Sequence, residues 1–256
     1  MSTAAAPPAA GGALTLRPLG VTPRHPVRLF GRLDGLPYLE MLGQLHAALG
    51  VRRYLEIGTR KGDSLAHARG VAVCADPAFC VGPHAFAAVQ QAHFYQTTSD
   101  DYFARHDPKA ILGGPVELAF VDGLHHAEFV LRDVLNCEAH LAPGGLIVLH
   151  DVLPSTAGMA RRLGRLADGS LEPVVGAWTG DVWKVLPLLA RWRPGIRVTV
   201  LDCPRSGLAV LSGLEPGRVT PPEEVAALEA ELAALPDAAL PAWLAGLQVA
   251  DAARLV

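Results

Sequence analysis

Acidic and histidine side chains gather after two apolar runs of this sequence, residues 116–121 and 146–149. The group consists of Asp122, His125, His126, His150 and Asp151. Imidazole exchanges a proton near neutral pH, and carboxylates are common ligands of divalent cations. If the two runs are neighbouring parallel strands, their carboxyl ends meet at one edge of a sheet and these side chains face one crevice. Such a cluster could transfer protons or bind a metal ion.

A glycine loop between residues 53 and 64 is the second candidate site. An apolar run there ends in Glu56, and Gly58, Thr59, Gly62 and Ser64 follow. Glycines let a ligand lie against bare backbone, and the next helix offers unpaired N–H groups. The loop lacks the Lys-Ser/Thr ending of a phosphate loop, and Glu56 would repel a pyrophosphate, so an ammonium group or a ribose fits better. An ordinary strand-to-helix turn is the alternative.

Strand and helix patterns alternate along the chain, which is typical of a parallel sheet with helices on both faces. Apolar runs predict strands at residues 51–57, 71–76, 93–98 and 116–122. A Pro-Gly-Gly turn then leads into a fifth strand that ends in His150 and Asp151, and a hairpin of 196–202 and 207–212 follows. Helical spacing predicts helices at residues 37–49, 64–69, 161–165, 182–192, 222–235 and 243–256. Gly180 and Asp181 could begin the helix at 182–192.

Asp76 ends the second predicted strand, twenty residues beyond Glu56. That offset is close to the one at which an acidic residue binds ribose hydroxyls in dinucleotide folds. An Asp after a strand is also a common turn residue, so a structural role stays open. If Gly58 and Asp76 contact a ligand, a bulky residue at 58 or Asp76→Ala should weaken binding without unfolding the domain.

The ordered motifs resemble one protein family. They are Glu-x-Gly-x-x-x-Gly at 56–62, Phe-Val-Asp-Gly-x-His at 120–125 and Leu-x-Pro-Gly-Gly-Leu-Ile-Val-Leu-His-Asp at 141–151. Together they are similar to the methyltransferase 24 family of class I S-adenosylmethionine-dependent methyltransferases, related to catechol O-methyltransferase and the macrolide sugar O-methyltransferases. The resemblance covers roughly residues 37–211. It implies an α/β fold, a doubly wound seven-stranded Rossmann-like sheet with an antiparallel last strand.

The resemblance also implies a cofactor, S-adenosylmethionine. Its implied binding residues are Glu56, Gly58, Thr59, Gly62, Ser64, Asp76, Ser99 and Asp100. Ser99 and Asp100 follow the third predicted strand, whose end meets the adenine in such enzymes. Helix capping would explain these two residues equally well. Arg60 stands where fuller forms of the first motif have a glycine.

The resemblance places catalysis at His125 and Asp122. His125 falls where the relatives have a Lys or His as general base, although a polar surface residue is the alternative, and His126 is more simply structural. Asp122 and Asp151 match two metal-binding carboxylates, which would suit Mg²⁺. The third metal position departs from the relatives, because Val152 or His150 stands where they have an acid. Imidazole favours transition metals, so the need for a metal stays open.

Composition limits the partners. The chain has 256 residues, is 50% hydrophobic and has a net charge of −3. It lacks a Lys/Arg block, which argues against nucleic acid, and its four cysteines lack a Cys-x-x-Cys pair, which favours a reducing cytoplasm over a disulfide framework. We expect no signal peptide and no membrane span. We expect a flexible segment at 1–36, a methyltransferase domain at 37–214 and a helical extension at 215–256 that caps the sheet or mediates a homodimer.

The predicted function is O-methylation of a small-molecule hydroxyl, on a sugar or a secondary metabolite. Trp178 and Trp183 could stack on such a ring, and the arginines at 161, 162 and 165 could bind an anionic substrate. Helix packing and a solvated helical face are the alternatives for these residues. A non-catalytic cofactor-binding or scaffold protein of a glycan or metabolite pathway is the rival function. A metal-dependent hydrolase is disfavoured because the His and Asp residues lack the usual helical metal spacing.

Overall fold

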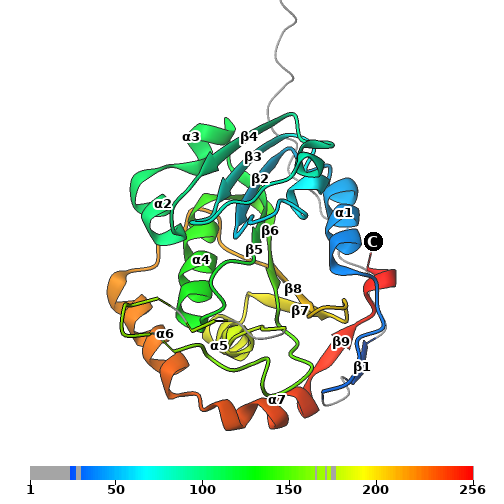
Figure 1. Cartoon of the computed structure of the whole chain (residues 1–256), viewed down its shortest axis with the longest axis vertical. Helices are drawn as coiled ribbons and strands as arrows, with labels where there is room; N and C mark the ends of the chain where they lie inside the picture. The colour runs from blue at the N-terminus through cyan, green and yellow to red at the C-terminus, as the bar shows by residue number, and fades with distance from the viewer. Residues whose placement is uncertain (1–23, 27–29, 165, 171, 174–176, 256) are drawn as a thin grey trace, which may run out of the picture.

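A nine-stranded mixed sheet runs through the computed structural model, with helices on both faces (Figure 1). The structure describes residues 24–26, 30–164, 166–170, 172–173 and 177–255. The strand order is β1-β9-β7-β8-β6-β5-β2-β3-β4. The strands are β1 Arg24–Pro26, β2 Arg53–Ile57, β3 Val71–Ala75, β4 Gln91–Tyr95, β5 Val116–Val121, β6 Leu141–His150, β7 Arg197–Leu201, β8 Leu208–Ser212 and β9 Gln248–Ala250.

Strands β2 to β8 form the predicted sheet. Neighbours from β4 through β6 are parallel, and β8 is antiparallel to both β6 and β7. The Rossmann-like fold with an antiparallel last strand is therefore confirmed. The count of seven strands was too low, because β9 extends the sheet beside β7 and β1 pairs with β9. Both added strands have three residues, too few for an alternating pattern to show.

The helices are α1 Tyr38–Leu49, α2 Ser99–Arg105, α3 Pro108–Leu112, α4 Ala127–His140, α5 Val185–Trp192, α6 Pro222–Ala234 and α7 Leu240–Gly246. The 3₁₀ helices are η1 Leu65–His67, η2 Pro83–Phe86, η3 Val182–Lys184, η4 Asp237–Ala239 and η5 Ala252–Arg254. Three helix predictions were wrong. The segment 64–69 forms only η1 because Gly62 and Gly70 confine it, and 161–164 is not helical. The tail at 243–256 divides into the end of α7, β9 and η5.

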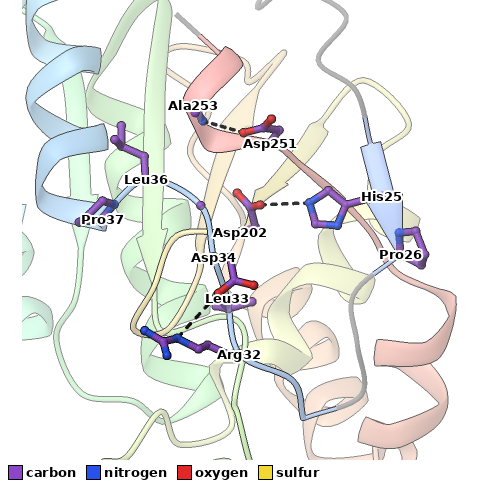
Figure 2. Close-up of a pocket in the computed structure, with 11 residues that line it drawn as sticks. His25, Pro26, Arg32, Leu33, Asp34, Leu36, Pro37, Asp202, Asp251 and Ala253 are labelled. Atoms are coloured by element: carbon purple, nitrogen blue, oxygen red, sulfur yellow. Dashed lines mark hydrogen bonds and ion pairs between the residues drawn. The ribbon is translucent and has the colours of Figure 1, made fainter.

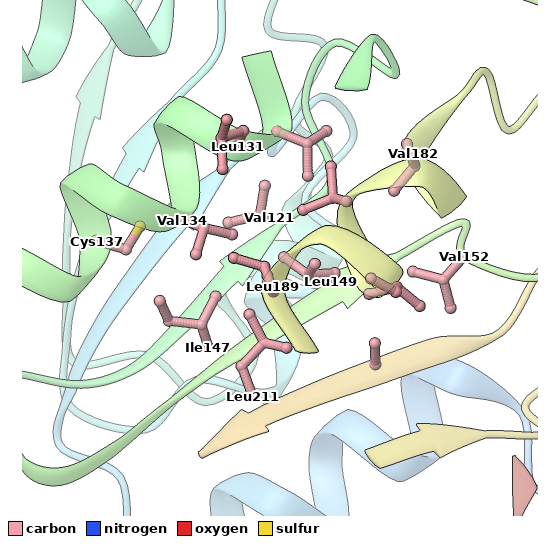
Figure 3. Packing of buried hydrophobic residues seen from close by; sticks show 14 of the residues in the cluster. Val121, Leu131, Val134, Cys137, Ile147, Leu149, Val152, Val182, Leu189 and Leu211 are labelled. Carbon is pink, nitrogen blue, oxygen red and sulfur yellow. The ribbon is translucent and has the colours of Figure 1, made fainter. Parts of the chain in front are cut away.

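Alternate side chains of the central strands enter two separate cores. Leu55, Ala119 and Ile147 pack on the side of α4 and α5, whereas Leu118 and Val148 pack on the side of α1 and η1. Figure 3 shows the first core, where side chains of α4 and α5 meet those of β5, β6 and β8. Because both faces are covered, the central strands β5 and β6 are mostly apolar, and their cavity-facing polar residues, Asp122 and Asp151, follow directly after the strands.

The two ends of the described chain meet at one sheet edge. His25 on β1 lies 3.0 Å from the Asp202 carboxylate, whose other oxygen accepts from the Ala252 N–H at 2.9 Å. A pocket of about 550 Å³ lies between these residues and the segment 32–37 that leads into α1 (Figure 2). Residues 1–23 lie outside the described residues, so the segment expected to be flexible is seen only from β1 onward. The domain limits at 37 and 214 stay a prediction.

The C-terminal region packs against the sheet and its helices. Helix α6 adjoins α4 and α5, and β9 adjoins β7 (Figure 1). Across the part of the chain that the structure describes, helices long and apolar enough to cross a bilayer are absent.

A buried ion pair joins α4 to the end of α5. Glu138 is fully buried, and its carboxylate oxygens lie 2.5 and 2.6 Å from Arg193 Nη2. The backbone N–H of Glu215 also donates to this carboxylate, at 2.7 Å. Two residues earlier in α5, Arg191 forms a similar pair with Glu231 at 2.6 Å, but both side chains are exposed.

Arg193→Ala should therefore lower the free energy of unfolding by about 3–5 kcal/mol, because it leaves the Glu138 charge buried without its cation. Arg191→Ala is the matched control and should cost less than about 1 kcal/mol, because water screens an exposed pair. Urea denaturation of both variants measures the difference. Equal losses would contradict a structural role for the buried pair.

Candidate functional site

A cavity of about 910 Å³ opens at the carboxyl ends of β2, β3, β5 and β6. Its predicted site residues are Gly58, Thr59, Ser64, Asp76, Ser99, Asp122, His125 and Asp151. Tyr38, Thr98, Phe129, His150 and Trp178 also line it. The structure thus brings most of the candidate residues together around one space. Glu56, Gly62 and Asp100 are not among its lining residues.

The glycine loop follows β2 and passes very close to the end of β5. Gly58 has φ +88°, and a Cβ there would lie 2.0 Å from the Asp122 carbonyl oxygen. Gly62 has φ +81°, and a Cβ there would lie 2.5 Å from the Ala85 Cβ. Gly58 is therefore required by the approach of two backbones. Our expectation that a bulky residue at 58 would test ligand contact alone was wrong, because it would also push the two strand ends apart.

Glu56 lies behind this loop. Its carboxylate is fully buried and accepts from the Tyr54 hydroxyl at 2.6 Å and from the Ser64 hydroxyl at 2.9 Å. Burial raises the pKa of Glu56 to about 7, although the hydrogen bonds from Tyr54 and Ser64 oppose this change. Glu56 thus supports the loop through Ser64 and does not present its oxygens to the cavity.

Asp76 faces the cavity and also shapes the loop. Its Oδ2 accepts from the Arg60 N–H at 2.8 Å, and its Oδ1 accepts from the Ala78 N–H at 2.6 Å. Arg60 has φ +42°, the left-handed conformation that usually favours glycine. Each carboxylate oxygen retains a second lone pair that could accept from a ligand hydroxyl.

The two candidates after β4 differ in their surroundings. Ser99 begins α2 and lines the cavity. The Asp100 carboxylate instead forms a bidentate ion pair with Arg132, at 2.9 and 2.8 Å. Arg132 in turn lies over the ring of Phe129, 4.3 Å from its centroid. Asp100 therefore anchors α2 to α4, and only Ser99 is open to a ligand.

The Asp122 carboxylate is shared by two imidazoles. Its Oδ1 lies 3.0 Å from His150 Nδ1 and 3.2 Å from His125 Nε2. The second nitrogen of each ring also faces an oxygen acceptor: His150 Nε2 lies 2.9 Å from the Arg205 carbonyl, and His125 Nδ1 lies 3.2 Å from the Trp178 carbonyl. Asp151 Oδ2 lies 3.4 Å from His125 Nδ1. A neutral imidazole has only one donor, so both rings are best satisfied as imidazolium.

The electrostatics of the cluster agree with this geometry. Burial by itself lowers the pKa of His150, but the charges of Asp122 and Asp151 outweigh it and raise the pKa to about 9. The pKa of His125 is raised above its usual value by the same two carboxylates against the effect of burial. Burial works to raise the pKa of Asp122, yet His150 and His125 hold it well below its usual range. Burial and the nearby charge of Asp122 raise the pKa of Asp151 against the two histidines, so Asp122 is the more firmly ionised of the two carboxyl groups.

Sequence comparison assigns this region to a family. Residues 55–152 match the family model described as a methyltransferase domain, methyltransferase 24. This segment covers less than half of the chain, and it is similar to the methyltransferase domains of that family. The matched range begins in β2 and ends just after Asp151, so it includes the glycine loop, Asp76 and the Asp122 cluster. No curated protein matched the chain.

Solved structures that are similar to this chain share little sequence with it. Cofactor-bound Rv0187 from MTB is 20% identical over 70% of this chain and 80% of its own, with a TM-score of 0.47. TomG, an O-methyltransferase from Streptomyces achromogenes in complex with SAM, is 16% identical over 70% and 79%, with a TM-score of 0.48. An O-methyltransferase from Bacillus cereus in complex with SAH is 16% identical over 72% and 84%, with a TM-score of 0.45. Identities and scores this low assign no activity to this chain.

Among the residues that the structure describes, Asp122, His125 and Asp151 form a group that could hold a metal ion. Ligand atoms of Asp122, His125 and Asp151 all lie within 4.8 Å of one another. Asp151 reaches this place from a left-handed backbone conformation, φ +58°, while Val152 is fully buried in the core. With one imidazole and two carboxylates, the set fits a divalent transition metal better than Mg²⁺. Whether an ion binds there stays a prediction.

Two aromatic rings flank the histidines of the methyltransferase domain. Tyr38 packs on His150 with ring centroids 4.0 Å apart, and Trp178 packs on His125 at 4.9 Å. No sequence pattern pointed to Tyr38, because it reads as an ordinary first residue of α1. Trp178 was a candidate wall and does line the cavity, but Trp183 is buried against Trp243 at 5.4 Å.

The predicted anion site is not supported by the described arginines. Arg161 pairs with Glu172 at 2.7 Å, and Arg162 pairs with Glu128. Arg165 lies outside the described residues. His126 is buried and edge-on to Trp178, and it does not line the cavity.

The raised pKa of Glu56 predicts a pH-dependent stability. The folded protein holds a proton on Glu56 up to about pH 7, whereas an unperturbed glutamate has a pKa of 4.5, so the contribution of Glu56 to stability falls as pH rises between these values. Relative to Glu56→Gln, the parent should lose roughly 3 kcal/mol of unfolding free energy from pH 4.5 to 7. Urea unfolding of both proteins at several pH values measures this change. If the difference in unfolding free energy between the two proteins does not change with pH, burial does not raise the pKa of Glu56.

Proposed function

We propose that the protein transfers a methyl group from S-adenosylmethionine to a hydroxyl oxygen of a small molecule. In this reaction the oxygen forms a bond to the methyl carbon, the carbon–sulfur bond breaks, and the hydroxyl proton leaves to a base. S-adenosylhomocysteine and the methyl ether are the products. One observation carries the proposal: a single cavity joins the glycine loop and Asp76 to the Asp122 and His125 cluster.

The cofactor occupies the side of the cavity near β2 and β3 in this proposal. Asp76 accepts from the ribose hydroxyls, Thr59 and Ser64 lie along the loop, and Ser99 meets the adenine edge. Glu56 and Gly62 act by holding the loop, and Asp100 by holding α2, because none of the three lines the cavity. The loop from Gly58 then offers backbone, with no side chain, to the rest of the cofactor.

The acceptor occupies the side near β5 and β6. His125 takes the hydroxyl proton, and Asp122 orients the imidazole and compensates its charge. His125 must first lose a proton, since both its nitrogens face acceptors. A sulfonium bound next to the ring favours that loss, because a nearby positive charge lowers the pKa of an imidazolium.

The walls of this side suit an acceptor with a ring. Tyr38 and Trp178 present aromatic faces beside His150 and His125. Aromatic faces pack well on a sugar or an aromatic metabolite. A divalent ion held by Asp122, His125 and Asp151 is the alternative to a His125 base, because an imidazole that ligates the ion cannot also take the acceptor's proton. Such an ion would polarise the acceptor oxygen and lower its pKa.

Asp76→Ala should weaken S-adenosylmethionine binding by about 10- to 100-fold, because it removes a charged acceptor of two hydroxyl hydrogen bonds. Calorimetry on the folded variant measures the affinity, with thermal unfolding as a check on the Arg60 and Ala78 contacts. Asp101→Ala, which removes an exposed carboxylate paired with Arg105, is the control and should bind like the parent. Equal affinities for all three proteins would place the cofactor elsewhere.

His125→Ala should lower kcat by about 10²–10⁴-fold while cofactor affinity changes little, because a general base acts in the chemical step. His126→Ala should cost much less. The acceptor is found first by mass spectrometry of a hydroxylated panel. In the parent, activity should fall as pH drops through the His125 pKa, which Asp122 and Asp151 raise and the sulfonium of the bound cofactor lowers.

Three experimental outcomes would change the proposed mechanism or function. Near-parent kcat in His125→Ala, with the same acid limb, moves proton removal to another group. If exhaustive chelation abolishes turnover and Mn²⁺ or Mg²⁺ restores it, a metal ion takes part in the reaction. Cofactor binding with no transfer to any acceptor favours a non-catalytic binding protein.

A further inference from the structure

Four residues, Trp178 to Asp181, form a strap against the loop that carries His125. The Asp181 N–H donates to the His125 carbonyl at 3.2 Å, and His125 Nδ1 lies 3.2 Å from the Trp178 carbonyl. Gly180 has φ +57°, and a Cβ there would lie 1.7 Å from the His125 carbonyl oxygen. The strap and the loop therefore touch along their backbones.

The Asp181 carboxylate caps a helix far away in the sequence. It is buried, and its Oδ1 accepts from the N–H of Ala127, the first residue of α4, at 2.8 Å. Its Oδ2 lies 3.4 Å from Arg162 and 3.5 Å from Lys184, which balance the charge. The sequence predicted that Asp181 would begin the helix after it, but the side chain makes no cap there.

This cap controls the segment on which His125 sits. The Ala127 N–H, at the first residue of α4, has the Asp181 carboxylate as its acceptor. If α4 moved away from the strap, the Ala127 N–H would lose its acceptor, and a buried N–H without an acceptor costs about 1–3 kcal/mol. This cost holds the start of α4 against the strap. His125 lies two residues before Ala127, and its carbonyl is fixed by the Asp181 N–H. Asp181 thus holds the backbone on both sides of His126.

We infer that Asp181 is a positioning residue that fixes the direction of the His125 imidazole toward Asp122 and the acceptor. The inference rests on the proposed function, in which His125 takes the acceptor's proton. Asp181 does not line the cavity, so it acts through His125. A misplacement of about 1 Å in a reacting group can cost as much as about 10²-fold in rate.

Asp181→Ala should lower kcat by about 10- to 100-fold and leave the Kd for S-adenosylmethionine within about twofold. Asp181→Asn keeps an Oδ1 acceptor for Ala127 and should restore most of kcat. Asp107→Ala is the control: it removes the cap of α3, where Oδ1 accepts from the Lys109 N–H at 2.9 Å. It should lose stability without losing kcat.

The inference is overturned if Asp181→Ala lowers kcat no more than Asp107→Ala does, or if cofactor affinity falls in step with kcat. Should Asp181→Ala fail to fold, Gly180→Ala replaces it. Its added Cβ pushes the strap off the His125 carbonyl, so the same loss of kcat with unchanged affinity is expected. Parent kcat in Gly180→Ala would equally overturn the inference.

A second measurement does not depend on turnover. The imidazole resonances of His125, assigned with His125→Gln, should shift in Asp181→Ala and stay unchanged in Asp107→Ala. If the parent methylates no acceptor, the proposed function fails and these resonances alone decide the positioning. Unchanged resonances in Asp181→Ala would show that Asp181 does not direct the ring.

Discussion

The imidazole rings of His125 and His150 both contact one carboxylate oxygen, Asp122 Oδ1, and the arrangement of the site depends on this shared contact. Both rings must donate to it, while their other nitrogens face backbone carbonyls. The cluster is therefore held by charge balance between two carboxyl groups and two cations in a mostly buried place. Any ligand that brings its own positive charge, a sulfonium or a metal ion, competes with the ring protons for the same oxygens. The number of protons on the two rings should therefore fall when such a cation binds.

Backbone contacts connect this cluster to the glycine loop. The Asp122 N–H donates to the Ile57 carbonyl at 2.9 Å, and Gly58 lies against the Asp122 carbonyl with no room for a Cβ. The Gly58 N–H donates to the Ala75 carbonyl at 2.9 Å, one residue before Asp76. These hydrogen bonds hold the ends of β2, β3 and β5 together beside the place where the proposed methyl transfer would occur. Precise alignment of donor and acceptor is the main requirement of that chemistry.

The sequence predicted most of the sheet and the position of the site, because both depend on local patterns. Buried strands read as apolar runs, and polar residues such as Asp76 and Asp122 stand where those runs end. What could not be predicted depends on pairs far apart in the chain. Strand β1 pairs Arg24 with Ala250, and Asp181 caps α4 rather than its own helix. Local pattern also says which residues are near the cavity but not which way a carboxylate points, so the partners of Glu56 and Asp100 were missed.

The central claim is that Asp122 holds His125 and His150 as imidazolium rings. The most direct measurement is ¹⁵N NMR of the histidine side chains at pH 7, without cofactor or added metal. The account predicts that both ring nitrogens of His150 carry protons and that this ring ionises near pH 9, while His125 ionises above its ordinary value. A neutral His150 at pH 7, with one unprotonated ring nitrogen, would contradict it.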